Sequence, residues 1–281
     1  MKISKLFTSG SLAPAWHFTA AHTLWRLMFS HNGMIFGEDR DTEKKTATFF
    51  CIDAHNGKSR WQQKQFSDQW WIGLEGTVDK KLFLHGFKKP DMPEHKSIIC
   101  VDAESGNELW RNDDCALFTC KGPYVFGYRD LFERRLYYKL RETDGMLIEE
   151  LQTLPEDIDG SAPLEKNDFH FSQPYNDRDE QTGKIVLGLY KGKMEDIRSV
   201  EFIETAVYTV LNIHSVRSVT DRGVEDLTNT LFIAETQSGK KLYSDILNES
   251  TPYPVPDSFF IDPPMLYYIK ERKTLTAVNL Q

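Results

Sequence analysis

ICVDAESGNELW, the stretch from Ile99 to Trp110, repeats a phrase that the chain has already used as CIDAHNGKSRW from Cys51 to Trp61. Each copy begins with an apolar run rich in β-branched and aromatic residues, which predicts a strand. A polar turn that ends in glycine follows, and then a short strand that carries tryptophan. One hairpin of this kind cannot bury both of its faces alone, so the repeat predicts that successive units stack on one another.

Weaker copies of the phrase continue along the chain. IAETQSGKKLY, from Ile233 to Tyr243, keeps Gly239, and KLRETDGMLIEE, which begins at Lys139, keeps Gly145. The glycine of the phrase recurs at intervals of 49, 39 and 94 residues, and the last interval is two spacings of 47. We therefore expect one degenerate copy near Gly192.

The two ends of the chain carry complementary parts of the phrase. AVNLQ, from Ala277 to Gln281, matches its opening and stops before the turn and the tryptophan strand. LAPAWHF places Trp16 in a strand-like context that has no preceding partner. Pairing of these two strands would complete a final unit and close a ring of blades, which removes exposed sheet edges.

The fold predicted from this pattern is all-β, with a single β-propeller domain over residues 1–281. Six four-stranded blades of about 47 residues each fit the length. The expected blades lie at residues 22–63, 69–112, 115–152, 168–190, 200–246 and 257–280, the last one closed by the strand at Trp16. The fourth, around DFHFSQ and KIVLGLY, is irregular, and five blades are the alternative if it does not form.

The phrase resembles the PQQ-type repeat of quinoprotein-like β-propellers, which are related to alcohol dehydrogenases that bind pyrroloquinoline quinone. In that family a run like A-x-D-x-x-T-G-x-x-x-W docks each blade on the next. The chain is also similar to small bacterial proteins with this repeat that have no assigned activity. The quinone-dependent dehydrogenases use a pair of adjacent cysteines and a calcium site. This chain has no adjacent cysteines, so no cofactor is expected.

Composition limits the expected partners and location. A net charge of -8, without any run of Lys and Arg, argues against a nucleic-acid partner. No segment approaches the ~18 apolar residues that cross a bilayer, and the N-terminal segment turns polar before a signal-length apolar run develops. The four cysteines are expected to be small buried hydrophobes, which favours a cytoplasmic location.

Short motifs indicate no particular chemistry. Cys115 and Cys120 lack the C-x-x-C spacing of zinc sites, so no metal is expected. Carboxylates alternate in EDRDTE, from Glu38, and in NDRDEQTG, from Asn176, but neither stretch has the glycine and distal glutamate of a calcium loop. Both are interpreted as solvated turns. Neither a G-x-S-x-G elbow nor an H-E-x-x-H motif occurs.

An alignment of the innermost strand of each blade gives a candidate site. Setting WRL, WWI, FHF, VEF and FFI in register predicts the residues that face a central channel: Arg26, Trp71, His170, Glu201 and Phe260, with Leu117 in the third blade. Ionisable side chains around one axis suit an anion, a polar ligand or acid and base work. A solvated channel is the alternative, and a slip of one residue in register would replace every member of the set.

Two functions stay open at this point. The leading hypothesis is a non-catalytic propeller that binds a protein or peptide on one face, with Trp70 and Trp71 as anchors whose change to alanine removes binding. The alternative is a small-molecule or carbohydrate hydrolase or lyase that acts through His170 and Glu201, with Arg26 holding an anionic group. No oligomeric state follows from the sequence.

Overall fold

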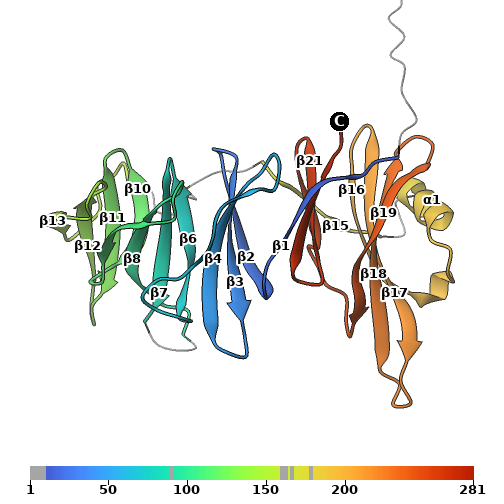
Figure 1. Cartoon of the computed structure of the whole chain (residues 1–281), viewed down its shortest axis with the longest axis horizontal. Coiled ribbons are helices and arrows are strands. Elements are labelled where there is room, and N and C mark those ends of the chain that lie inside the picture. The colour runs from blue at the N-terminus through green and yellow to red at the C-terminus, as the bar shows by residue number, and fades with distance from the viewer. Residues whose placement is uncertain (1–10, 89–91, 159–163, 165–167, 177–179) are drawn as a thin grey trace, which may run out of the picture. The chain divides into compact units, whose positions relative to one another are not determined.

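The computed structural model describes residues 11–88, 92–158, 164, 168–176 and 180–281, and these residues form five antiparallel sheets and one α-helix (Figure 1). The predicted all-β class is confirmed. The chain divides into two compact units. The three-sheet unit lies within Ala20–Asn167, and the two-sheet unit lies within Met1–Thr19 and Asp168–Gln281. Residues 1–10, which begin the N-terminal segment, and 177–179, in NDRDEQTG, lie outside the described residues.

The three-sheet unit consists of three meanders, in which each strand pairs antiparallel with the next strand of the chain. The first contains β2 (Thr23–Ser30), β3 (Met34–Asp41), β4 (Thr46–Asp53) and β5 (Ser59–Lys64). The second contains β6 (Ile72–Val78), β7 (Lys81–Phe87), β8 (His95–Asp102) and β9 (Glu108–Asn112). The third contains β10 (Ala116–Lys121), β11 (Tyr124–Asp130), β12 (Arg135–Arg141) and β13 (Leu147–Leu151). These sheets lie at the first three predicted blades.

The two-sheet unit has one sheet of order β15-β16-β17-β18-β19 and one of order β1-β22-β21-β20-β14. The first contains β15 (Gln173–Pro174), β16 (Ile197–Glu204), β17 (Tyr208–Val219), β18 (Glu225–Glu235) and β19 (Lys241–Thr251). The second contains β1 (Pro14–Thr19), β22 (Thr274–Asn279), β21 (Met265–Lys270), β20 (Phe259–Asp262) and β14 (His170–Phe171). Strands β16 to β19 lie at the fifth predicted blade, and β20 to β22 lie at the sixth.

The strand at Trp16 pairs with the last strand of the chain. β1 runs antiparallel to β22, with Trp16 opposite Ala277 and Pro14 opposite Val278. Trp16 is buried, and its ring lies 5.9 Å from the ring of Tyr267 on β21. The predicted pairing of the two terminal strands is therefore confirmed.

The strand predicted at KIVLGLY is wrong, because this segment lies in helix α1 (Glu180–Leu189) and the residue after it. Its apolar side chains Ile185, Val186 and Leu189 lie on one face of a helical turn and pack against the sheet of β16 to β18. A short apolar run of this kind fits a strand or a buried helix equally well. A short 3₁₀ helix, η1 (Met194–Asp196), follows near Gly192, where the sequence predicts a degenerate copy of the phrase. Among the described residues, five sheets and no sixth are present.

No helix in the described part of the chain is both long enough and apolar enough to cross a membrane.

The tryptophan of the first repeated phrase docks on the glycine turn of the second. Trp61 is buried, and its indole N–H donates a hydrogen bond of 2.9 Å to the carbonyl oxygen of Ala103. Gly106 has a φ of +67°, and a Cβ added to it would lie only 2.6 Å from the Trp61 ring. Glycine is needed there for both reasons, since it tolerates positive φ and leaves room for the ring.

The next repeat makes the same contact. Trp110 donates a hydrogen bond of 2.9 Å to the carbonyl oxygen of Glu142, and a Cβ on Gly145 would lie 2.4 Å from its ring. Gly145 again has a positive φ, of +69°. Each phrase therefore joins one sheet of the three-sheet unit to the following sheet, which explains why the phrase recurs.

The core of the three-sheet unit fills the space between successive sheets. Phe36 and Phe49 of the first sheet pack with Leu74 of the second in a buried cluster. Cys51 and Cys100, at equivalent places in the two phrases, are fully buried, and burial raises the pKa of both thiols to about 12. These thiols stay protonated at neutral pH, as expected of packing residues.

Candidate binding pocket

The five residues predicted for a central channel fall in the two different units. Arg26 lies on β2 and Trp71 lies just before β6, both in the three-sheet unit. His170 on β14, Glu201 on β16 and Phe260 on β20 lie in the two-sheet unit. Their grouping around one channel stays a prediction.

Within the two-sheet unit, Glu201 is engaged in local structure. The side chain is mostly buried, and it accepts hydrogen bonds from the Asp257 N–H at 3.2 Å and the Asn212 side-chain amide at 3.4 Å. Burial raises the pKa of Glu201. Among the described residues no hydrogen bond or ion pair joins it to His170. Phe260 stacks on Tyr267, with ring centroids 5.5 Å apart.

A pocket of about 590 Å³ opens in the three-sheet unit. Aromatic and basic side chains from the first two sheets and the segments beside them line it: Trp25 on β2, Arg40 on β3, Lys45 in the β3–β4 turn, Trp70 and Trp71 before β6, and Phe87 on β7. Its volume falls in the range usual for ligand sites. Trp25 is 54% exposed, whereas Trp70 and Trp71 are half-buried.

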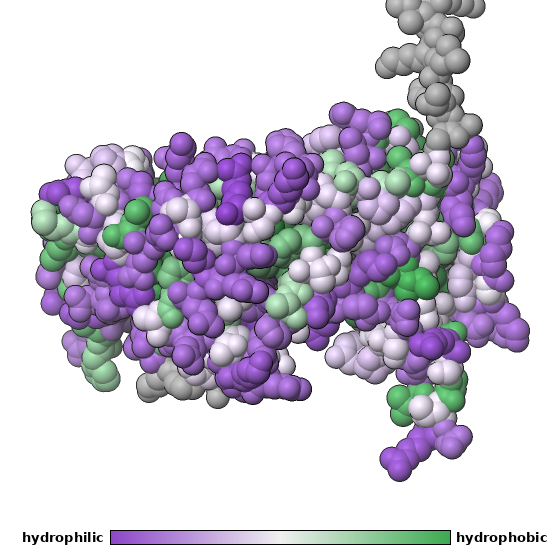
Figure 2. Space-filling view, viewed as in Figure 1, coloured by the Kyte–Doolittle hydropathy of each residue, from purple (hydrophilic) through white to green (hydrophobic). Residues whose placement is uncertain are grey.

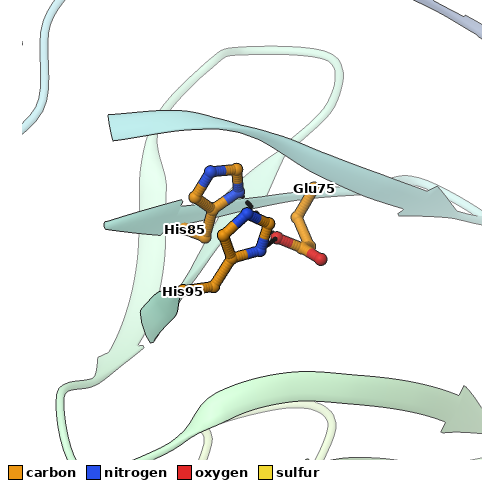
Figure 3. A group of neighbouring side chains, drawn as sticks. All are labelled: Glu75, His85 and His95. Carbon is orange, nitrogen blue, oxygen red and sulfur yellow. Dashed lines mark ion pairs between the residues drawn. The ribbon is translucent and has the colours of Figure 1, made fainter. Parts of the chain in front are cut away.

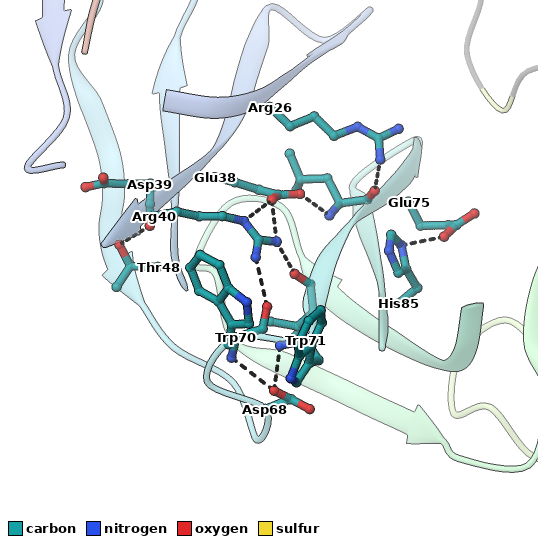
Figure 4. Close-up of polar contacts among 12 residues, drawn as sticks. Arg26, Glu38, Asp39, Arg40, Thr48, Asp68, Trp70, Trp71, Glu75 and His85 are labelled. Atoms are coloured by element: carbon teal, nitrogen blue, oxygen red, sulfur yellow. Dashed lines mark hydrogen bonds and ion pairs between the residues drawn. The ribbon is translucent and has the colours of Figure 1, made fainter. Parts of the chain in front are cut away.

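The base of this pocket is a buried ion pair between neighbours on β3. The Arg40 guanidinium donates to Glu38 Oε2 from Nε at 2.9 Å and from Nη2 at 2.7 Å. It also donates to the carbonyl oxygens of Trp70, at 2.8 Å, and Ile72 (Figure 4). Glu38 in turn accepts the Leu74 N–H at 2.7 Å. The pair therefore ties the first sheet to the backbone of the second sheet.

These contacts correct the interpretation of EDRDTE as a solvated turn. Glu38, Asp39, Arg40 and Asp41 lie in β3 and are all buried. Asp39 accepts hydrogen bonds from two backbone N–H groups of the loop before β2, at 2.9 and 2.8 Å. Charged groups are tolerated inside a protein when they are paired in this way.

The segment that carries the two pocket tryptophans is held by Asp68. Its Oδ1 accepts the N–H groups of Trp70, at 3.0 Å, and Trp71, at 2.8 Å. The Trp71 ring packs edge-on against Phe87, with centroids 6.1 Å apart. Asp68 thus presets the backbone of the pocket wall.

Arg26 belongs to the same network as Trp71 but lies outside the pocket lining. Its Nη1 donates to the Leu74 carbonyl oxygen at 2.8 Å, and Figure 4 shows it on the side of Glu38 away from the two tryptophans. Among the described residues, these hydrogen bonds link Arg26 to the tryptophan segment through Leu74, Glu38 and Arg40.

The pocket carries positive charge over aromatic faces. The Arg40 guanidinium carbon lies 5.0 Å from the Trp70 ring centre, and the Lys45 ammonium nitrogen lies 4.9 Å from the same ring. No carboxylate is among the described residues that line the pocket. Lys45 is exposed, so its ammonium is accessible to a ligand. The arrangement suits a ligand with an apolar group and a negative charge.

Sequence reasoning identified Trp70 and Trp71 but missed Trp25, Lys45 and Phe87. A signal for Trp25 was present, because the alignment of WRL with WWI places Trp25 and Trp70 at matching positions. The alignment predicts that the middle residue of each triplet faces the channel, and Trp25 is the first residue of its triplet. Lys45 and Phe87 carry no local signal, since only the packing of two sheets brings them together.

Comparison with known proteins gives one family match. A model described as a domain of unknown function (DUF4905) matches residues 29–110, which include most of the first two sheets. No curated protein sequence matches the chain.

Several solved structures are similar at low sequence identity. BamB from Moraxella catarrhalis has a TM-score of 0.32 and 8% identity, over 90% of this chain and 84% of that one. Quinohemoprotein alcohol dehydrogenases from Pseudomonas putida HK5 and Comamonas testosteroni each have a TM-score of 0.33, with 11% and 14% identity over 98% of this chain. The chain spans less than half the length of these two dehydrogenases, at 45% and 43%. TM-scores of this size carry no inference about function for this chain.

Proposed function

We propose that this chain is a non-catalytic binding protein that holds a peptide segment of a partner protein in the pocket of Trp25, Trp70 and Trp71. The observation that carries the proposal is the accessible aromatic lining of this pocket, with Trp25 54% exposed at its wall. Tryptophan is enriched among residues that dominate binding energy at protein interfaces. The bound segment has an apolar side chain that enters the aromatic pocket and a carboxylate beside it that pairs with Lys45.

The composition of the pocket favours binding over catalysis. None of its described lining residues is a carboxylate, histidine, serine or cysteine, which are the usual acids, bases and nucleophiles of hydrolases. The Arg40 guanidinium is already used by Glu38 and two carbonyl oxygens. Lys45 is therefore the principal charge offered to a ligand.

The face of the molecule drawn in Figure 2 is consistent with a localised site. The face drawn in Figure 2 is covered mostly by hydrophilic residues, with smaller hydrophobic areas between them. A broad apolar patch on that face would instead suggest a large permanent interface.

The same proposal includes one propeller domain with the five sheets as its blades, in a reducing compartment such as the cytoplasm. The docking of Trp61 and Trp110 on successive glycine turns supports the blade assignment. The four cysteines are free thiols, which suits a reducing compartment.

The test is selection of binding peptides from a random display library with the full chain as bait. We expect enriched peptides to share an apolar residue next to Asp or Glu. Fluorescence anisotropy is expected to show that Trp25→Ala weakens binding by about tenfold or more, the usual effect of removing an interface anchor. The double variant, Trp70→Ala with Trp71→Ala, is expected to abolish peptide binding. Lys45→Ala is expected to weaken binding and to reduce its dependence on salt.

Phe132→Ala is the matched control, because Phe132 is a fully exposed aromatic residue of the same unit outside the pocket. The affinity of the Phe132→Ala variant for the selected peptides is expected to equal that of the wild type. Enriched peptides that bind Trp25→Ala and the double variant as tightly as the wild type would place the site elsewhere. Failure of any peptide to be enriched would also refute the proposal.

A further inference from the structure

Three potential metal ligands converge on neighbouring strands of the second sheet. Glu75 lies on β6, His85 on β7 and His95 at the start of β8. Glu75 Oε2 lies 2.6 Å from His85 Nδ1 and 2.8 Å from His95 Nδ1 (Figure 3). One donor atom from each residue lies within 4.8 Å of the other two.

Two irregularities in the sheet direct these side chains. The pairing of β6 with β7 shifts between Leu74 and Gly76, which leaves Glu75 as the extra residue. The pairing of β7 with β8 shifts between Leu84 and Gly86, on either side of His85. β-bulges turn a side chain away from its regular direction and are common beside functional sites.

His85 is a buried polar side chain without a hydrogen bond. Its side chain is 2% exposed, and neither ring nitrogen has a hydrogen-bond partner. Glu75 Oε2 is also without a hydrogen-bond partner, although it lies 2.6 Å from His85 Nδ1. An unsatisfied buried polar group costs about 1–3 kcal/mol, and a bound ion is one of its ordinary explanations.

We propose that Glu75, His85 and His95 form a binding site for a divalent transition-metal ion of the zinc class. Two imidazoles and one carboxylate are a known three-ligand set for zinc, with a further position left for water or another ligand. Zinc is bound at about 2.0–2.2 Å by such atoms, so the ligand atoms must separate to about 3.3 Å. The Glu75 oxygen, now 2.6 Å from His85 Nδ1 and 2.8 Å from His95 Nδ1, has to move away from them by about 0.7 and 0.5 Å to meet this geometry.

Binding also requires one ring to turn. The rings of His85 and His95 are stacked, with centroids 3.5 Å apart and an angle of 7° between their planes. A metal ion has to lie near the plane of each imidazole that binds it. His95 is the ring that turns, because its side chain is 32% exposed and lines a cavity of about 200 Å³, which gives the ion access. The His85 side chain, in contrast, is 2% exposed.

The test is isothermal titration calorimetry of the full chain with zinc chloride after treatment with a chelator. We expect one zinc ion per chain, and a melting temperature that rises with zinc because the ion binds the folded state. Glu75→Gln and His95→Gln are each expected to weaken zinc binding by more than about 100-fold, since loss of an outer partner alone costs about 10- to 100-fold. His95 is half-exposed, so its variant is expected to fold.

The matched control is His55→Gln, which removes an exposed histidine outside the cluster. Zinc binding of this variant is expected to equal that of the wild type. The proposal is overturned if the wild type binds no stoichiometric zinc, or if Glu75→Gln and His95→Gln bind it as tightly as the wild type. Equal weakening in His55→Gln would show that exposed histidines bind the ion adventitiously. None of these results depends on the peptide pocket.

Discussion

Replacement of Glu38 by alanine is expected to lower the free energy of unfolding of the three-sheet unit by about 3–5 kcal/mol. The Glu38 side chain is 2% exposed and Arg40 is 6% exposed, so the variant leaves an uncompensated charge inside the protein. It also leaves the Leu74 N–H without its acceptor. Breaking one side of a buried ion pair is costly even where the intact pair contributes little net stability.

Urea denaturation followed by tryptophan fluorescence measures this effect, because five of the six tryptophans lie in the three-sheet unit. Glu43→Ala is the control, since Glu43 is an exposed carboxylate in the same hairpin. Its effect is expected to stay within about 0.5 kcal/mol. If the two variants unfold at the same urea concentration, Glu38 does not hold the first sheet to the second in the way described.

Replacement of Trp61 by alanine is expected to cost about 3–5 kcal/mol, the usual range for removing a large buried aromatic side chain. The change opens a cavity above Gly106 and removes the hydrogen bond to the Ala103 carbonyl oxygen. Trp61→Phe keeps part of the ring contact and loses the hydrogen bond, so an intermediate loss is expected.

The same denaturation experiment compares Trp61→Ala with Trp25→Ala. Both variants lose one indole, but Trp25 is 54% exposed whereas Trp61 is 7% exposed. The loss for Trp25→Ala is expected to stay below about 1 kcal/mol. Similar losses in the two variants would contradict the role of Trp61 in docking one sheet on the next.

The sequence predicted most strands because the repeated phrase marks their ends. Apolar runs rich in β-branched and aromatic residues define many of the strands, and glycines at positive φ, such as Gly106 and Gly145, lie in the turns between them. The strand predicted around Ile185 is wrong because a short, mostly apolar segment such as KIVLGLY does not distinguish a strand from a buried helix. Its buried face appears only once it packs on the neighbouring sheet.

The pocket could be predicted only in part, because exposure is set by packing between sheets. Trp61 and Trp25 look alike in sequence, yet one is buried between two sheets and the other is exposed. The sequence predicts solvated side chains for Glu38 and Arg40, because nothing local shows that they pair with each other and with the second sheet.

The histidine cluster escaped prediction because its spacing fits no familiar metal motif. Glu75, His85 and His95 are ten residues apart in succession, and hairpin turns bring them together. In an antiparallel meander, residues placed evenly about each turn become neighbours. In this sheet the register places Gly73 opposite His85 and Phe87 opposite His95. The cluster therefore depends on the shifts in register beside Glu75 and His85, which the sequence does not show.

The central claim is that the six tryptophans form two sets, one that builds the fold and one that binds a partner. Fluorine NMR of the chain labelled with 5-fluorotryptophan tests this directly, with each resonance assigned by a single Trp→Phe substitution. On addition of a selected peptide, we expect the resonances of Trp25, Trp70 and Trp71 to shift and those of Trp16, Trp61 and Trp110 to stay unchanged. Shifts confined to the buried tryptophans, with none in the pocket, would contradict the account.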